Sequence, residues 1–465
     1  MTSTGLLPRT PSIRHSPMHP GSSAVLAIIL IAYFMVILDA SVVITGLPRI
    51  RADLELSTGA LAWVQDAYLL AFGGGLLLGA RAGDLLGRRR MFALGLVVFT
   101  LASAGVGLAP SGPWLVGARA VQGVGAAVLA PSTLALLTAG FPEGPARTRA
   151  TSLYGAVAGI GAGVGLVVGG LLADLVSWRA GFLVNLPVGA AMLVAGRRAL
   201  PETPRVRGQL DLPGALLATL GPTALVYGLI RAGESGWSDT GGVVGLGLGV
   251  GLLAALVAVE RSAAQPIVPL RLFASRERSG AYLVRMLFLG AMMSFFLFTS
   301  QYLQDERSFS ALAAGLAYLP MTVVNFVVAL TVPRLRRHVS GPTLLVAGLV
   351  LAVAGMGWLG TIDPGTSYLA GVALPMVLIG AGQGLAFGPL TASGIARVDP
   401  ADAGAASGVL NSVHQLGGAL GIGLVLAATG SYPAAMLVAA ALLTTALGAA
   451  VGFVVRGAAT SPRTG

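Results

Sequence analysis

The chain has 465 residues, of which 55% are hydrophobic and only 10% are charged. Soluble domains carry about 25% charged residues, so this chain could not cover a water-facing surface of its own size. The net charge of +11 does not indicate a nucleic-acid partner, because the arginines form short clusters between apolar runs. With no cysteine and four scattered histidines, the sequence offers no disulfide and no metal-ligand spacing. We therefore expect lipid around most of the chain, and neither a metal nor a cofactor.

Apolar segments long enough to cross a membrane recur along the whole chain, since a span needs about 20 residues at a rise of about 1.5 Å each. The first, at 24–46, is too long for a signal-peptide core, so we expect it to be retained. The other expected helices, in chain order, lie at 60–80, 91–109, 113–139, 151–173, 180–199, 212–231, 241–259, 280–302, 311–332, 341–361, 366–391, 404–428 and 431–455. The sequence thus predicts an all-α membrane protein with 14 transmembrane helices.

The arginines predict how these helices are oriented. If both termini lie on one side, that side holds 22 of the 29 arginines and the other side holds five, while Arg119 and Arg285 lie within helices. Positively charged loops stay inside the cell, so we expect a multi-pass protein of the plasma membrane with both termini in the cytoplasm. The short connections leave no room for a soluble catalytic domain.

A weak repeat predicts how the chain is divided. Gly83–Arg90 joins the second and third helices, and the arginine-rich Arg334–His338 joins the corresponding pair among the last six. The expected parts of the chain are a cytoplasmic tail at 1–23, a six-helix half at 24–199, two additional helices with their loops at 200–279, a second six-helix half at 280–455 and a cytoplasmic tail at 456–465.

Several motifs, in the right order, resemble those of one family. Ala80–Arg90 resembles the signature loop of the major facilitator superfamily, and Leu115–Gly125 resembles its fourth-helix motif. Leu38–Pro48 resembles the first-helix motif of its fourteen-helix drug:proton antiporters. Other segments that resemble the same branch are Trp178–Pro187, Tyr302–Gln304 and Gly404–Gly418. The resemblance covers about residues 24–455 and implies the major facilitator fold, two six-helix halves plus two extra central helices. It also implies a monomeric carrier that exports drugs, antibiotics or other small amphipathic molecules in exchange for protons, without a nucleotide.

Three ionisable residues lie at a similar depth in the expected helices, about 10 Å below the outer boundary: Asp39, Asp66 and Arg119. An ionised group in hydrocarbon costs at least about 2.5–3.5 kcal/mol, so such groups face a cavity or find partners. They could form a structural ion pair that holds helices together. Alternatively, Asp39 carries a proton, with its proton affinity set by the competition between Arg119 and burial. Asp66, expected nearer the rim, is the second candidate, and Arg119 matches the family's arginine implicated in proton transfer.

The connection between the second and third helices is expected to be a tight turn of about ten residues. An aspartate there can accept hydrogen bonds from a helix N-terminus or pair with arginine, and glycine permits a sharp turn. A purely topogenic loop would explain the arginines but not the aspartate. By resemblance, this loop latches the two halves in one state of transport, although Ala80 and Leu85 depart from the family pattern. The latch candidates are Arg81, Gly83, Asp84, Gly87, Arg88 and Arg89.

The fifth expected helix is rich in glycines spaced four apart, which let another helix approach closely. The packing motif consists of Gly161, Gly165, Gly169 and Gly170. Leu166 stands where the antiporter motif has a proline, so an expected kink is missing. Because of this departure, the sequence does not decide whether transport is coupled to protons. The alternative to proton-coupled export is a proton-independent or importing carrier for a specific metabolite.

Polar, aromatic and methionine residues within the expected spans are candidates for lining a substrate cavity, although single polar residues more often pair with a neighbouring helix. They are Tyr33, Met35, Gln122, Met292, Phe295, Gln383, Asn411 and His414. Arg285, five residues inside its expected helix, should reach the membrane surface with its head group. A membrane enzyme would need clustered nucleophiles and a sensor an output domain, and neither is present, nor is a nucleotide-binding loop. The sequence predicts a transporter that alternates access between two halves.

Overall fold

The computed structural model describes residues 20–459, except 142, 204, 207, 364, 400 and 401. The predicted tails lie outside the described residues for 1–19 and for 460–465. Within the described part, the chain is helical without strands and has 14 helical segments long and apolar enough to cross a membrane. The predicted fold class and number of spans are therefore confirmed.

The first eight spans are formed by α1 (Pro20–Asp53), α2 (Thr58–Leu86), α3 (Arg88–Gly107), α4 (Gly112–Gly140), α5 (Pro145–Leu175), α6 (Ala180–Leu183) with α7 (Asn185–Ala199), α8 (Leu212–Ser235) and α9 (Thr240–Ser262). After the short η1 (Leu270–Ala274), the last six are formed by α10 (Arg276–Gln301) with η2 (Tyr302–Glu306), α11 (Ala311–Ala317) with α12 (Leu319–Leu335), α13 (Gly341–Leu359), η3 (Leu369–Ala373) with α14 (Leu374–Gly394), α15 (Ala403–Ala428), and α16 (Tyr432–Ala449) with η5 (Ala450–Val455). The four-residue α17 (Arg456–Ala459) follows.

Two spans that were expected to be continuous are interrupted, each next to a proline. The sixth span breaks at Val184, three residues before Pro187, and the tenth breaks at Tyr318, two residues before Pro320. Proline has no N–H to donate and its ring clashes with the preceding helical turn, so a helix is weakest there. By contrast, α5 runs unbroken from its N-terminal Pro145 to Leu175, as the absence of an internal proline predicts.

The expected ten-residue turn between the second and third spans is wrong. Helix α2 continues to Leu86 and α3 begins at Arg88, so Gly87 alone connects them. Its φ of 106° lies in a region that side chains disfavour, which explains a glycine at this position. Gly83 and Asp84 lie in the last turns of α2 rather than in a loop.

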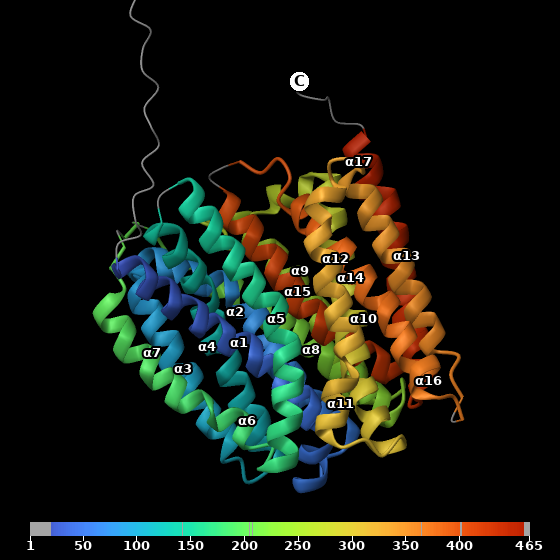
Figure 1. The fold of residues 1–465 in the computed structure, drawn as a ribbon. Helices are drawn as coiled ribbons and strands as arrows, with labels where there is room; N and C mark the ends of the chain where they lie inside the picture. The colour runs from blue at the N-terminus through green and yellow to red at the C-terminus, as the bar shows by residue number, and fades with distance from the viewer. Residues whose placement is uncertain are drawn as a thin grey trace, which may run out of the picture.

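Helices α1 and α17 place the two described ends of the chain on the same side of the bundle, here called the termini side (Figure 1). The opposite side is called the distal side. Helix α2 packs on α4, α1 on α5, α10 on α15, and α14 on both α12 and α13. Segments far apart in sequence meet where α2 packs on α15 and α5 on α11.

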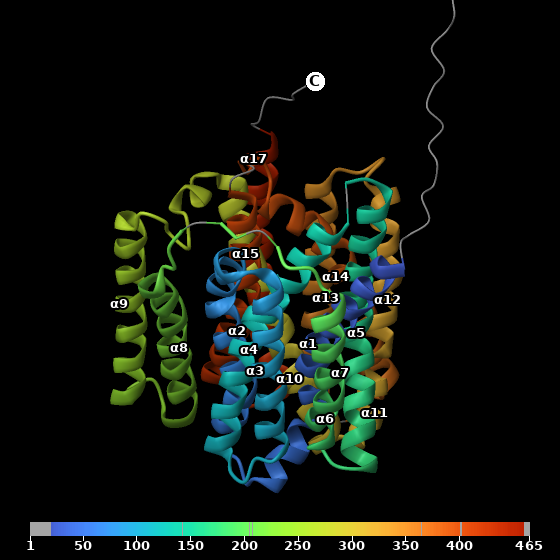
Figure 2. The same ribbon diagram turned by 90° about the vertical axis from the view of Figure 1, so that its left-hand side faces the viewer.

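Helices α8 and α9 form a pair at one edge of the bundle (Figure 2). Helix α8 packs against α2 and α15, whereas α9 packs mainly against α8. Helix α9 exposes a series of apolar side chains, which suits a surface that faces lipid. These side chains are Val243, Val244, Leu248, Val250 and Val257.

Candidate functional site

Helices α1, α2 and α4, which belong to the first six spans (the first group of helices), enclose a completely buried ion pair. Arg119 of α4 donates from Nη1 to Asp39 Oδ2 of α1 at 2.8 Å, and both side chains have no exposed surface. Arg119 also donates from Nε to the carbonyl of Val64 on α2 at 3.1 Å. Its guanidinium lies 4.3 Å from the ring centroid of Tyr68, a favourable cation–π geometry. The pair therefore ties three helices together.

Three further polar side chains complete this network. Asp39 Oδ1 accepts hydrogen bonds from Gln122 Nε2 at 2.7 Å and from Asn185 Nδ2 at 2.9 Å. The same two amides donate to the Ser103 hydroxyl at 2.8 and 3.2 Å. Because Asp39 is neutralised by one cation and hydrogen-bonded by two amides, its charge is compensated within the network. Gln122 belongs to this network, and its predicted role as a cavity residue stays a prediction.

Asp66 of α2 lies apart from this network. It is fully buried, and neither carboxylate oxygen has a hydrogen-bond partner among the described residues. Leu69, Gly73 and Leu77 contact α15, and Asp66 shares that face of α2 by helical spacing. An unpaired ionised carboxylate is costly there, so this conformation favours the protonated acid.

The latch candidates sit where α2 meets α3 on the termini side. Arg88 donates from Nε and Nη2 to Asp84 Oδ1 at 3.2 and 3.0 Å, and from Nη1 to the carbonyl of Ala135 on α4. Arg81 donates to Gln265, which follows α9, and the backbone N–H of Arg89 donates to Glu202. These contacts fasten the end of α2 to α4 and to the connections around the α8–α9 pair.

The glycines of the packing motif let α5 approach its neighbours. A side chain at Gly161, Gly165 or Gly169 would collide with α1, around Ile37, Ser41 and Val42. A side chain at Gly170 would collide with the backbone of Ala311 at the start of α11. Thus the motif brings α1 and α11 against α5.

On the distal side, hydrogen bonds connect α1 and α5 with α10 and α11. The Ser300 hydroxyl donates to the carbonyl of Ile44 at 2.8 Å, and Gln304 Nε2 donates to the carbonyl of Thr45 at 3.1 Å. Asp174, at the end of α5, accepts from the backbone N–H groups of Ala311 and Leu312. These contacts close the distal end between the two groups of helices.

Several predicted cavity residues are packed in this conformation. Met35, Met292 and Phe295 are buried, and Phe295 meets Tyr318 edge to face. Tyr33 stacks on Tyr154 with ring centroids 3.9 Å apart. Their role as cavity residues stays a prediction.

Arg285 does not reach the membrane surface as expected. Helix α10 begins at Arg276, so Arg285 lies nine residues into it, and the side chain is only 3% exposed. Its guanidinium lies over the ring of Phe387 at 3.8 Å, and Nη1 donates to the Thr391 hydroxyl at 3.2 Å. Both partners are on α14, so the arginine turns into the bundle.

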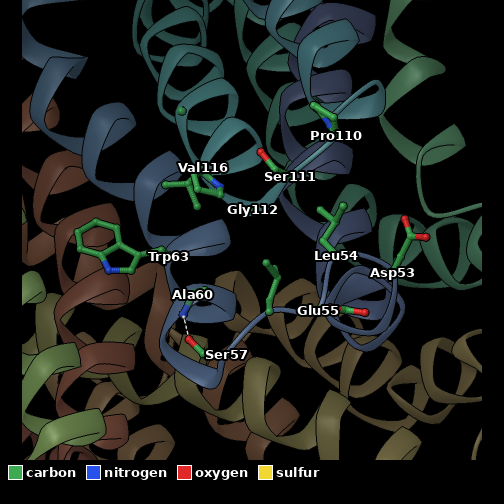
Figure 3. A pocket seen from close by; sticks show the side chains of 13 residues that line it. Asp53, Leu54, Glu55, Ser57, Ala60, Trp63, Pro110, Ser111, Gly112 and Val116 are labelled. Carbon is green, nitrogen blue, oxygen red and sulfur yellow. Dashed lines mark hydrogen bonds between the residues drawn. The ribbon is translucent and has the colours of Figure 1, made fainter.

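A broad pocket opens on the distal side between the α1–α2 and α3–α4 connections (Figure 3). Its volume is about 950 Å³, and Leu54, Trp63, Pro110 and Val116 contribute to its wall. None of its lining residues belongs to the predicted site. The pocket therefore lies at the distal end of the helices and does not include the buried ion pair of Asp39 and Arg119.

Ser103 and Asn185 are the site residues that sequence reasoning missed. Each is a polar residue inside a predicted span, and Asn185 also belongs to the Trp178–Pro187 motif, so these were the available signals. Which helix each one faces follows from packing and from the break before Pro187. Asn185 begins α7 immediately after that break and points at Asp39.

A bundle whose described residues form 14 helices long enough to span a membrane, with the ion pair of Asp39 and Arg119 in its interior, defines a polytopic membrane transporter. The chain belongs to the major facilitator superfamily, whose model matches residues 29–422. It is 42% identical over 417 residues to the cephamycin export protein of Amycolatopsis lactamdurans, covering 88% of this chain and 86% of that protein. It is 43% identical over 409 residues to the puromycin resistance protein of Streptomyces alboniger, covering 86% and 80%. The chain is thus a transporter of small molecules, not an enzyme.

Solved structures show the same fold. The POT family transporter PepTSo matches with a TM-score of 0.71 at 15% identity, over 96% of this chain and 100% of the other. The human organic anion transporter MFSD10 matches with a TM-score of 0.60 at 17% identity, over 93% and 100%. At such identities the likeness concerns the fold alone.

Proposed function

We propose that this transporter exports small amphipathic molecules, antibiotics among them, across the plasma membrane in exchange for protons. The observation that carries the proposal is the similarity to relatives named for antibiotic export and resistance, which covers most of both chains. The arginine distribution supports an orientation with both termini in the cytoplasm. The distal side then faces outward, and the protein acts as a single chain.

The transport cycle rests on two six-helix halves, 24–199 and 280–455, that rock against each other, with 200–279 as an additional pair. The contacts of α2 with α15 and of α5 with α11 are the surfaces on which the halves would move. The bonds of Ser300, Gln304 and Asp174 hold the outer end shut, so this conformation would receive substrate from the cytoplasm.

Proton coupling uses two carboxylates in different settings. Asp39 is neutralised by Arg119, so a proton can replace the cation only if the network of Gln122 and Asn185 rearranges. Asp66 has no partner among the described residues and faces α15, whose movement against α2 would expose it to water. Asp66 would then release its proton in one state and bind it in the other, which links protonation to the rocking motion.

The experiment uses inside-out vesicles with an imposed proton gradient and a panel of fluorescent cations and antibiotics. Asp39→Asn and Asp66→Asn should each abolish the gradient-driven part of uptake while leaving exchange down a substrate gradient. Asp363→Asn, in an exposed connection, is the matched control and should behave as the unmodified chain. Gradient-driven uptake that persists in both site variants would remove these carboxylates from the coupling.

A further inference from the structure

The second group of helices contains a buried cation without an acidic counterpart. Arg285 on α10 is 3% exposed, and its Nε atom has no hydrogen-bond partner among the described residues. The segments 278–304, 365–398 and 403–428, which include nearly all of α10, α14 and α15, contain no Asp or Glu. Arg119 has Asp39 at 2.8 Å, whereas the partners of Arg285 among the described residues are a hydroxyl and an aromatic ring. A buried guanidinium is costly unless an anion compensates it.

Two more unsatisfied polar atoms lie in the same region. His414 Nδ1 on α15 and Gln383 Oε1 on α14 are buried without a hydrogen-bond partner among the described residues. The His414 ring meets the ring of Phe387 edge to face, with centroids 6.0 Å apart, and Arg285 lies over that same ring. Gln383 precedes Phe387 by one helical turn, on the same face of α14. Donors and an acceptor thus gather around one aromatic surface.

This cluster lies in the part of the bundle that is nearer to the termini side. Asn411, one turn before His414, is exposed, unlike the rest of α15 from 405 to 427. Thr391 lies three residues before the end of α14 on that side, and Arg285 lies in the nearer part of α10. A molecule that enters from the termini side would meet Asn411 first and Arg285 next.

We infer that Arg285, His414 and Gln383 form a binding subsite for the carboxylate end of an amphipathic organic acid. The guanidinium and the imidazole bind the carboxylate, Phe387 packs against the apolar body, and the Gln383 oxygen accepts a hydrogen bond from an N–H or O–H of the same molecule. The inference rests on the proposed export function and narrows its substrates to acids. A carboxylate supplies the negative charge that the segments 278–304, 365–398 and 403–428 around Arg285 lack.

The test compares a fluorescent acid, dansylglycine, with its methyl ester, using the full chain in phosphatidylcholine nanodiscs. The unmodified protein should bind the acid at least tenfold more tightly than the ester. Arg285→Gln should lose this preference and Arg285→Lys should keep part of it. Arg276→Gln, which removes an exposed charge from the same helix, should retain it in full. An equal preference in Arg285→Gln, or none in the unmodified protein, would overturn the inference.

Two further readouts distinguish a substrate subsite from a structural arginine and from a lipid site. Without ligand, Arg285→Gln should unfold at a higher temperature than the unmodified protein, because an uncompensated buried charge is removed; a lower temperature would indicate a structural role and overturn the assignment. Phosphatidylglycerol in the nanodiscs should leave acid binding unchanged, and competition from it would assign the subsite to a lipid headgroup. If vesicles export no member of the fluorescent panel, the proposed function fails, whereas export of the acid and the ester without preference overturns only the subsite.

Discussion

Asp174 caps the start of α11 through Leu312. Its Oδ2 accepts the Leu312 backbone N–H at 2.8 Å, and its Oδ1 accepts the Ala311 N–H at 3.1 Å. The carboxylate belongs to the end of α5 and also pairs with Arg49 of α1 at 3.1 Å. One side chain therefore joins three helices at the distal end, and its removal should loosen that end before anything else.

Asp174→Ala should increase distal opening by roughly two- to thirty-fold, because losing a helix cap costs about 0.5–2 kcal/mol. The chain has no cysteine, so Ser300→Cys provides a single labelling position inside this contact. The rate of labelling by a membrane-impermeant maleimide reports the opening. Asp363→Ala in the same background is the control. Equal rates in the two variants would show that the cap does not hold the distal end.

Gly170→Ala should impair transport and stability, because the added methyl would overlap the Ala311 backbone and force α5 away from α11. Overpacking of this kind costs about 1–3 kcal/mol. Gly155→Ala on the same helix is the matched control, since no heavy atom lies within 4 Å of a methyl placed there. Thermal unfolding of both purified variants and vesicle transport check the prediction, which fails if the two substitutions behave alike.

Arg119→Gln and Asp39→Asn should each destabilise the protein strongly, by about 3–5 kcal/mol, since each leaves a buried charge alone. The double variant should lose much less than the sum, because it leaves no uncompensated charge of this pair. Unfolding midpoints of the four proteins in the cycle measure the coupling. Additive losses would mean that the two groups act independently, in conflict with the 2.8 Å contact.

Asp402, which precedes α15, should contribute a pH-dependent part of the stability. Hydrogen bonds from Arg271, both 2.6 Å long, hold the pKa of Asp402 below its usual value. The contribution is therefore fully present above the unfolded pKa of about 3.9 and is lost as the pH falls through the lower folded value. Asp402→Asn should lower the unfolding midpoint slightly at pH 7 and progressively less in acid. A difference that grows with acidity would contradict this sign.

The number of spans and the fold class could be predicted because lipid selects for long apolar segments, and charges mark their ends. The depth of Asp39 and Arg119 below the outer boundary, counted at about 1.5 Å per residue, stays a prediction, and α1 continues to Asp53, beyond its expected end at 46. Pairing could not be predicted, because whether Asn185 and Ser103 point at Asp39 depends on helix rotation and on the interruption before Pro187. For Arg285 the error came from a helix start placed four residues too late. Four residues are about one helical turn, which places Arg285 too deep in α10 for its side chain to reach the membrane surface.

The single residue between α2 and α3 has a mechanical consequence. One residue spans at most about 3.6 Å, so Gly87 gives the two helices almost no freedom to slide past each other. A tilt of α2 against α15 should therefore move α3 as well. Helix α3 packs on α4, which contains Arg119. Because this connection is so short, we expect α2, α3 and α4 to move together, so that a displacement at the end of α2 reaches the ion pair of Arg119 and Asp39.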